Sequence, residues 1–166
     1  LPPLPDGLGS QPLADLRLLP PVRWDSGLAA AWRPGEPGAL AALDRFIDQA
    51  ADDYAKGRDR PGVLGTSRLS AHLHFGEIAP RLVVQQIAAR VAGGFTGPAE
   101  PFLRELGWRE FAQHLLYHYP QTPSEPLDPR FAHFPWREGG SDLRHAWELG
   151  RTGIPLVDAG MRELWQ

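Results

Sequence analysis

Hydroxyl side chains gather directly before a predicted helix start in the stretch GTSRLSAHLHFGEIAPR, residues 65–81. Thr66, Ser67 and Ser70 supply the hydroxyls. The unpaired N–H groups of a first helical turn point the same way, which is how proteins hold a phosphate or pyrophosphate. Arg68 adds a positive charge. The alternative is an ordinary helix cap, because Ser and Thr are common capping residues.

A second stretch, ELGWREFAQHLLYHYP at residues 105–120, combines charged and aromatic side chains on one predicted helix face. At 100° per residue, that face is shared by a carboxylate, a large aromatic ring, a guanidinium and a small side chain, namely Glu105, Trp108, Arg109 and Ala112, with Phe102 beside them. Such a face suits a flat ligand that forms hydrogen bonds. The alternative is an i,i+4 ion pair between Glu105 and Arg109, with Trp108 in the core.

The same helix carries His114 and His118 at i,i+4, a spacing that zinc-binding helices use. The sequence offers no third ligand in the same pattern. We therefore expect no metal site.

The third stretch is RTGIPLVDAGMRELWQ at residues 151–166. Pro155 fits a first helical turn, and Asp158 lies near the positive end of the helix dipole. The apolar stripe runs on to Trp165 without a capping Gly, a basic last turn or a following Pro. We expect the helix, and both ends of the chain, to lie inside a longer protein.

The elements that position these stretches are predicted to be helices. Apolar residues repeat at helical spacing from residue 38 to about residue 54, and further helices are expected at about 80–93, 98–119 and 143–149, with a short one after Ser70. No segment shows the alternating pattern of a strand, so the predicted class is all-α. Residues 1–37 hold 8 of the 18 prolines and are expected to form a linker or arm.

Composition narrows the functional classes. The 166 residues contain no Cys, which removes disulfides and thiolate chemistry, and no apolar run approaches the roughly 20 residues of a membrane span. Net charge is −3, but residues 54–109 carry eight basic against four acidic side chains. This middle third suits a polyanionic partner, and the alternative is a solvated helix surface. We expect a cytoplasmic protein with no membrane partner.

Taken in order, the three stretches resemble the flavin-binding helical domain of the DNA photolyase and cryptochrome family, most of all a bacterial class I cyclobutane pyrimidine dimer photolyase. The third stretch is similar to the family signature over its full length. The resemblance covers residues 38–166 and implies the N-terminal part of an all-α FAD-binding domain. Residues 1–37 resemble the linker after the family's antenna domain, which carries a second chromophore in some members.

The resemblance implies roles for single residues. FAD contacts are implied for Tyr54, Thr66, Ser67, Arg68, Leu69, Ser70, Phe102 and Arg109. Glu105 and Trp108 match the catalytic carboxylate and the aromatic side chain that meet the pyrimidine dimer. Contacts to DNA are implied for Arg58, Glu105, Trp108, Arg109 and Ala112.

Three positions depart from the family pattern. Trp136 aligns, after a one-residue insertion, with the surface end of the family's electron-relay tryptophans; the alternative is a Trp that anchors its own loop. Phe102 stands where relatives often have Trp, a mild change because an aromatic face remains. Ala79 replaces a common Ser, which predicts a weaker helix cap.

The resemblance implies light-dependent repair of cyclobutane pyrimidine dimers in damaged DNA by electron transfer from reduced FAD. The full-length protein is expected to be monomeric. Two alternatives are a cryptochrome photoreceptor, in which the Glu and Trp pair commonly differs, and repair of the (6-4) photoproduct, which usually has Gln at the Glu105 position. We expect the 166-residue chain alone to bind FAD weakly or not at all and to be inactive, since a half-pocket buries little ligand.

Overall fold

The computed structural model describes residues 9, 11–19, 21–22, 24–93, 99–135 and 140–165. Contacts divide the chain into two units, Leu1–Arg33 and Pro34–Gln166. In the first unit, η1 (Leu13–Leu16) and α1 (Ser26–Ala31) are short and bury little. The predicted limits of 1–37 for a linker and 38–166 for a partial domain stay a prediction.

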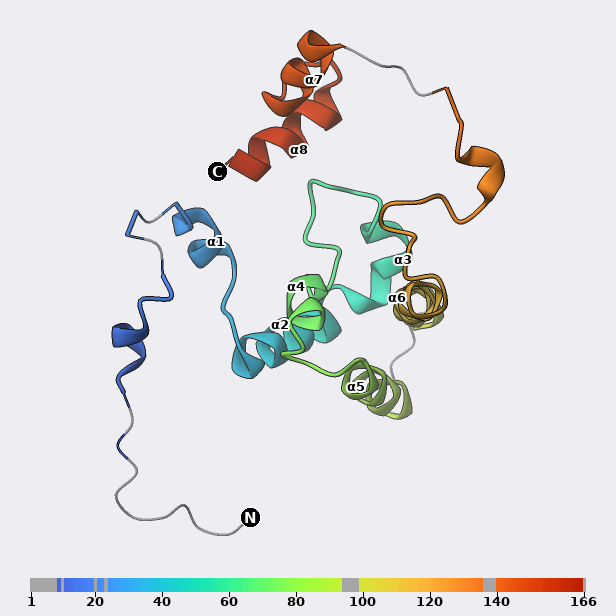
Figure 1. The fold of residues 1–166 in the computed structure, drawn as a ribbon. Helices are drawn as coiled ribbons and strands as arrows, with labels where there is room; N and C mark the ends of the chain where they lie inside the picture. Colours follow the sequence, from blue (N-terminus) through green and yellow to red (C-terminus); the bar gives the residue numbers. More distant parts are fainter. Residues whose placement is uncertain are drawn as a thin grey trace. The chain divides into compact units, whose positions relative to one another are not determined.

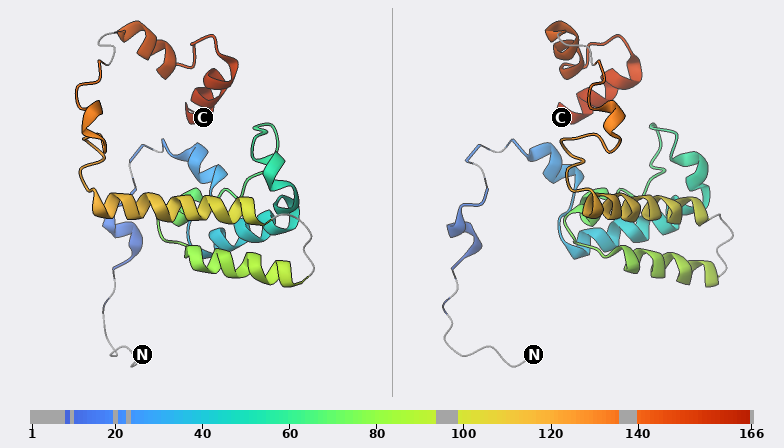
Figure 2. Two further views of the ribbon diagram at one scale, coloured as in Figure 1. Left: turned by 90° about the vertical axis from the view of Figure 1, so that its right-hand side faces the viewer. Right: turned by 45° about the vertical axis from the view of Figure 1, so that its right-hand side comes forward.

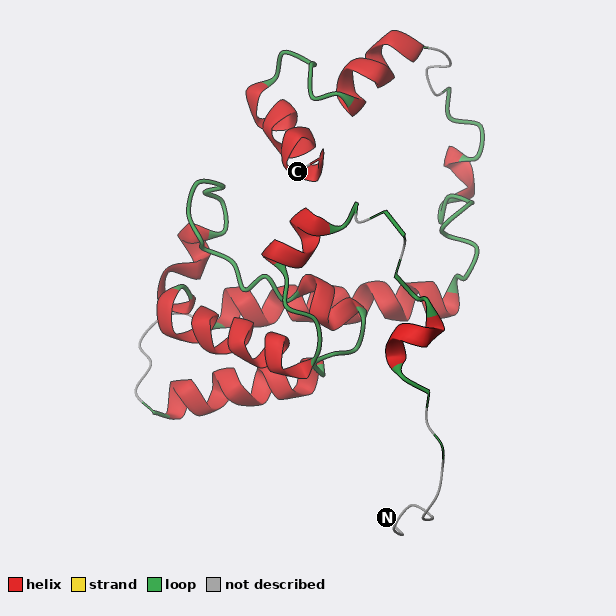
Figure 3. Ribbon diagram, turned by 90° about the vertical axis from the view of Figure 1, so that its left-hand side faces the viewer, coloured by secondary structure: helices red, strands yellow, loops and turns green. Residues whose placement is uncertain are grey.

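The second unit contains the helices that carry the three sequence stretches. In chain order these are α2 (Glu36–Gln49), η2 (Ala51–Asp53), α3 (Tyr54–Gly57), α4 (Ser70–His74), α5 (Pro80–Ala92), α6 (Glu100–His118), η3 (Pro129–Phe131), α7 (Ser141–Glu148) and α8 (Pro155–Trp165) (Figure 1). Over the described residues there are helices and loops and no strand (Figure 3). The predicted all-α class is confirmed.

The core lies among α2, α5 and α6, which run side by side (Figure 2). Leu43 and Phe46 from α2, Val83 from α5 and Phe102 from α6 are 6% exposed or less. These residues recur at helical spacing, so one face of each helix is apolar and removes its side chains from water. The shared core holds α6 against the elements that precede it.

The first predicted helix differs from the structure in its length. α2 begins at Glu36, because Pro37 fits the first turn, and it ends at Gln49. Ala50 then leaves the helical region with φ −133°, and η2 and α3 follow. The single helix predicted to about residue 54 is therefore wrong. The break lets Ala51 and Tyr54 turn toward the core, where they are 5% and 7% exposed.

The other predicted ends agree closely with the structure. α5 has Pro80 in its first turn and Gly93 after its last residue, and the Gly93 N–H donates to carbonyls of the final turn. Ala79 caps α5 without a side-chain hydrogen bond, as its substitution for Ser predicts. No described helix is long and apolar enough to cross a membrane.

α4 is anchored by a polar pair in which buried His72 contacts half-buried Glu77. His72 is 3% exposed, and its Nδ1 lies 2.5 Å from Glu77 Oε2. The Glu77 N–H also donates to the His72 carbonyl at 2.8 Å. These two contacts between His72 and Glu77 close the turn that follows α4 and hold this short helix in place.

Candidate functional site

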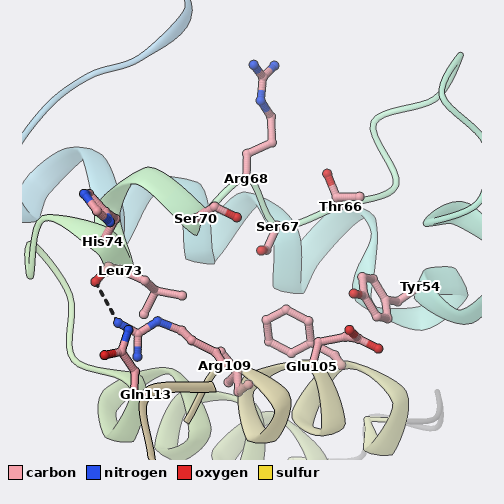
Figure 4. A pocket seen from close by; sticks show the side chains of 12 residues that line it. Tyr54, Thr66, Ser67, Arg68, Ser70, Leu73, His74, Glu105, Arg109 and Gln113 are labelled. Carbon is pink, nitrogen blue, oxygen red and sulfur yellow. Dashed lines mark hydrogen bonds between the residues drawn. The ribbon is translucent and has the colours of Figure 1, made fainter. Parts of the chain in front are cut away.

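A pocket of about 580 Å³ lies between the hydroxyl stretch and α6 (Figure 4). This volume falls within the usual range for small-molecule sites, roughly 300–1,000 Å³. Its lining residues are Tyr54, Thr66, Ser67, Arg68, Ser70, Leu73, His74, Phe102, Glu105, Leu106, Arg109 and Gln113. The first two sequence stretches, residues 65–81 and 105–120, therefore meet at one cavity.

The hydroxyl loop, residues 66–70, is held in place by one hydrogen bond within the loop and one from α2. The Leu69 N–H donates to Ser67 Oγ at 3.3 Å, and Arg45 Nη2 of α2 donates to the Ser67 carbonyl at 3.1 Å. Leu69 is 1% exposed, so its side chain fills the core and does not line the pocket. A flavin contact at this position would use the backbone.

Arg68 adopts a left-handed backbone conformation with φ 54°, which is uncommon for a residue with a side chain. Its side chain extends away from α6, while Ser67 and Ser70 lie nearer that helix (Figure 4). The left-handed conformation at Arg68 thus turns its side chain away from α6 while the Ser67 and Ser70 hydroxyls stay nearer that helix. Strained backbone of this kind collects at binding sites because the surroundings hold it there.

Two glycines close the base of the loop that leads to Thr66. A Cβ on Gly65 would lie 2.4 Å from the carbonyl carbon and oxygen of Gly57, a distance no side chain tolerates. The bare backbones of Gly57 and Gly65 thus form a neck, and residues 58–64 form the loop beyond it. The neck fixes where the hydroxyl stretch begins.

Two aromatic rings, Tyr54 and Phe102, line one side of the site, and the buried Phe46 ring packs against both. The Phe46 and Phe102 centroids are 4.5 Å apart, and Tyr54 meets both rings edge-on at 5.6 and 5.3 Å. Burial raises the pKa of the Tyr54 hydroxyl, so this side chain is neutral at physiological pH. Phe102 therefore retains the aromatic face that the sequence predicts at this position.

Glu105 is paired across the rim of the pocket with Arg58. Arg58 Nη1 lies 2.5 Å from Glu105 Oε1, and the two side chains are 34% and 35% exposed. The hydrogen bond from Arg58 lowers the pKa of the Glu105 carboxyl below its ordinary value. Glu105 is therefore an anion that can accept hydrogen bonds.

The alternative interpretation, an ion pair between Glu105 and Arg109, is wrong. Arg109 Nη2 donates instead to the Leu73 carbonyl at 3.2 Å, which links α6 to α4 (Figure 4), and Nη1 pairs with Glu110. An i,i+4 spacing permits a pair, but tertiary acceptors within reach compete for the guanidinium. Glu105 and Arg109 both line the pocket as separate groups.

Trp108 and Ala112 lie on α6 outside the pocket lining. Trp108 is 59% exposed and meets the Phe111 ring edge-on at 5.9 Å, so the alternative of a core Trp is wrong for the described residues. Ala112 is exposed as well. The helix thus turns a carboxylate toward the cavity and an aromatic ring toward its outer side.

Four pocket residues were not predicted, namely Leu73, His74, Leu106 and Gln113. Gln113 stands four residues after Arg109 and eight after Glu105, so helical spacing could have identified it. His74 follows Ser70 by the same four residues. Leu73 and Leu106 could not have been identified from the sequence, because an apolar residue on a helix is as compatible with the core as with a pocket wall.

Two further predictions concern Trp136 and the His114–His118 pair. Trp136 is outside the described residues, so its electron-relay role stays a prediction. The His114 and His118 rings meet edge-on with their centroids 4.3 Å apart, and no group of three potential metal ligands occurs among the residues described.

The third stretch forms α8 and the turn before it, and α8 packs against α7 as a helical hairpin. Asp158 is 8% exposed and accepts hydrogen bonds from Thr152 N and Oγ1, both at 2.7 Å, and from Gly153 N at 3.0 Å. Gly150 turns the chain with φ +62°. Trp165 Nε1 donates to the Glu148 carbonyl at 2.8 Å and so ties the end of α8 to the end of α7.

Comparison with known proteins identifies this arrangement. Residues 102–166 match a family described as the FAD binding domain of DNA photolyase. A deoxyribodipyrimidine photo-lyase of Agrobacterium fabrum is 41% identical over 158 residues, which are 95% of this chain and 33% of that protein. The chain belongs to the DNA photolyase and cryptochrome family.

Other members of this photolyase and cryptochrome family are similarly related. A deoxyribodipyrimidine photo-lyase of Thermus thermophilus is 46% identical over 86% of this chain and 32% of that protein. The crystal structure of a bacterial class III photolyase from Agrobacterium tumefaciens superposes with a TM-score of 0.83 at 41% identity, covering 95% of this chain and 33% of that one. The chain spans about a third of the length of these relatives.

FAD is the cofactor of this family domain, and the pocket fits it. Thr66, Ser67 and Ser70 offer hydroxyls suited to phosphate oxygens, and Phe102 with Leu106 offers apolar surface suited to a ring system. The phosphate-binding groups we have in mind are these hydroxyls and not the N-terminus of α4, because α4 has only five residues. The contact of each of these residues with FAD stays a prediction.

Proposed function

We propose that the protein containing this chain repairs cyclobutane pyrimidine dimers in DNA with light. The observation that carries the proposal comes from α6: Glu105 is an anion at the pocket rim, and Trp108, three residues further along the helix, exposes its ring outside the pocket lining. The Glu carboxylate can accept a hydrogen bond from a pyrimidine N–H, and the Trp ring can pack on the dimer. FAD, when bound, supplies the electron that splits the dimer and then recovers it.

The chain's own residues perform the binding steps. The hydroxyl loop and Arg109 hold the cofactor in the cavity, and Tyr54 and Phe102 wall it from one side. A base inside a duplex cannot reach such a cavity, so the damaged nucleotides must leave the stack, at a cost of a few kcal/mol that is smaller for damaged bases. Basic side chains of residues 54–109 would contact phosphates without reading sequence.

The direct test uses the protein with reduced FAD and an oligonucleotide that carries one thymine dimer. We expect the dimer to disappear under blue or near-ultraviolet light and to persist in the dark. An illuminated, flavin-loaded protein that leaves the dimer intact would overturn the proposal.

A mutation at Glu105 tests the site itself. Glu105→Gln keeps the shape but removes the charge, and loss of a charged hydrogen bond predicts a fall in repair rate of about 10- to 100-fold. Flavin content should change little, because the hydroxyl loop is untouched. Exposed Glu125 in the loop after α6 provides the control Glu125→Gln, which should repair normally. Equal losses of repair and flavin in Glu105→Gln would make Glu105 structural.

A cryptochrome photoreceptor is the second candidate, because Cryptochrome-1 of Arabidopsis thaliana is 39% identical over 83% of this chain. Bound flavin with no repair in the test above would favour it. The predicted class I assignment also stays a prediction, and the class III solved structure supplies the competing one. Repair of the (6-4) photoproduct is disfavoured by Glu at position 105.

A further inference from the structure

Arg58 contacts two pocket residues without lining the pocket itself. It stands at the C-terminal end of α3, where its N–H donates to the Tyr54 carbonyl at 3.0 Å. Its guanidinium carbon lies 5.4 Å from the centre of the Tyr54 ring, and Nη1 lies 2.5 Å from Glu105 Oε1. Arg58 therefore connects α3 to α6 across the rim.

These contacts limit the Glu105 side chain to a narrow set of orientations. A charge-assisted hydrogen bond is shorter and about twice as strong as a neutral one, and the Arg58 guanidinium also lies against the Tyr54 ring. One carboxylate oxygen is thereby engaged. Within the described residues no hydrogen bond to the second oxygen, Oε2, is recorded.

We propose that Arg58 is a positioning residue that aims Glu105 at the lesion, holding one carboxylate oxygen so that the other accepts a hydrogen bond from the damaged pyrimidine. This inference rests on the proposed repair function. An ionised carboxylate has no proton to donate, so the group it meets must be an N–H donor, such as the imide N–H of a thymine ring. Arg58 thus contributes to recognition of the damage through Glu105.

A direct contact between Arg58 and a DNA phosphate, which the family resemblance implies, predicts a different result. Phosphate contacts strengthen binding to damaged and undamaged DNA alike, since every nucleotide carries the same phosphate. Aiming Glu105 affects damaged DNA alone. The ratio of the two dissociation constants therefore separates the two roles.

The test is a double-mutant cycle in the flavin-loaded protein, with binding measured in the dark on oligonucleotides with and without one thymine dimer. We expect Arg58→Ala to lower the preference for damaged DNA about tenfold, and Glu105→Gln to lower it similarly. In the Glu105→Gln background, Arg58→Ala should cause no further loss, because the two residues act as one unit. Arg58→Lys, which keeps the charge, should restore part of the preference.

Arg60 supplies the matched control, since it is an exposed cation two residues along the same loop. Arg60→Ala should leave the preference for damaged DNA unchanged. Independent, multiplying losses in the Arg58 and Glu105 variants, or an unchanged preference in Arg58→Ala, would overturn the inference while leaving repair intact. A wild-type protein with no preference for dimers would instead overturn the proposed function. Flavin content and circular dichroism identify any variant that fails to fold, and Arg58→Lys then decides the question.

Discussion

Asp158 illustrates how one carboxylate can organise a whole segment. The sequence places it near the positive end of a helix, where an acid is favourable. The structure adds that both oxygens are used: Oδ1 accepts from Thr152 N and Oγ1, and Oδ2 accepts from Gly153 N. The turn between α7 and α8 is thus held by hydrogen bonds that the Asp158 carboxylate accepts. Asn could not accept all of them, because its amide nitrogen is a donor.

We therefore expect Asp158→Asn to lower the Tm of the protein by a few degrees at neutral pH. Differential scanning calorimetry measures the shift. Asp142→Asn, which changes an exposed acid in the first turn of α7, is the control and should change Tm little. Equal Tm values for wild type and Asp158→Asn would contradict the assigned role.

The same residue predicts a pH dependence of stability. The hydrogen bond from the Thr152 hydroxyl, with those from the backbone, lowers the pKa of Asp158 in the folded state. A depressed folded pKa contributes stability that is complete above the unfolded value, about 3.9, and is lost as pH falls through the folded pKa. The Tm difference between wild type and Asp158→Asn should therefore be largest near neutral pH and shrink in acid.

At this scale the sequence predicted residue types better than residue partners. Tyr54, Thr66, Ser67, Ser70 and Glu105, which the sequence singled out, all line the pocket, and their roles stay predictions. The partners of charged side chains were missed, because Arg58 and Glu105 are 47 positions apart and no local spacing predicts their contact. A partner is decided by which acceptors the fold brings within reach, and that is a tertiary property.

Among the elements, the neck between Gly57 and Gly65 has the clearest mutational consequence. Gly65→Ala places a Cβ against the backbone of Gly57, and overpacking of this kind costs on the order of 1–3 kcal/mol. We expect a lower free energy of unfolding in urea and weaker FAD binding, since Thr66 and Ser67 must shift with the loop.

Gly62→Ala is the control within the same loop, because a Cβ there meets nothing within 4 Å. Its stability should be unchanged or raised by up to about 1 kcal/mol, since Ala restricts the unfolded chain. If Gly65→Ala were as stable as Gly62→Ala, the neck would not be a constraint.

Helix positions were predicted well wherever Pro or Gly marks an end, as at Pro80, Gly93 and Pro155. The break at Ala50 was missed because Ala is the strongest helix former and nothing local opposes it. Burial of Ala51 and Tyr54 against α6 overrides that preference. Tertiary packing, which a linear pattern does not contain, decides such breaks.

For the whole molecule, the distribution of charge matters more than its sum of −3. The basic middle third supplies α3, its following loop and much of α6, the same elements that surround the pocket. We expect affinity for duplex DNA to fall as salt rises, with a log–log slope of about 0.9 for each phosphate contacted.

Fluorescence anisotropy between about 50 and 200 mM salt can measure this slope. The slopes for damaged and undamaged DNA should agree, because the phosphate contacts are shared and recognition of the dimer is not a phosphate contact. A clearly steeper slope for damaged DNA would mean that recognition itself depends on extra phosphate contacts.

The neck also separates two parts of the sequence that can change at different rates over evolution. Entropy makes a longer loop only slightly less favourable once its ends are fixed, by about 0.6 kcal/mol per doubling of length. The segment 61–64 can thus lengthen or shorten by insertion or deletion while Gly57 and Gly65 keep Thr66 in place. Variation among descendants of this sequence should collect there, a few residues from hydroxyls that hardly change.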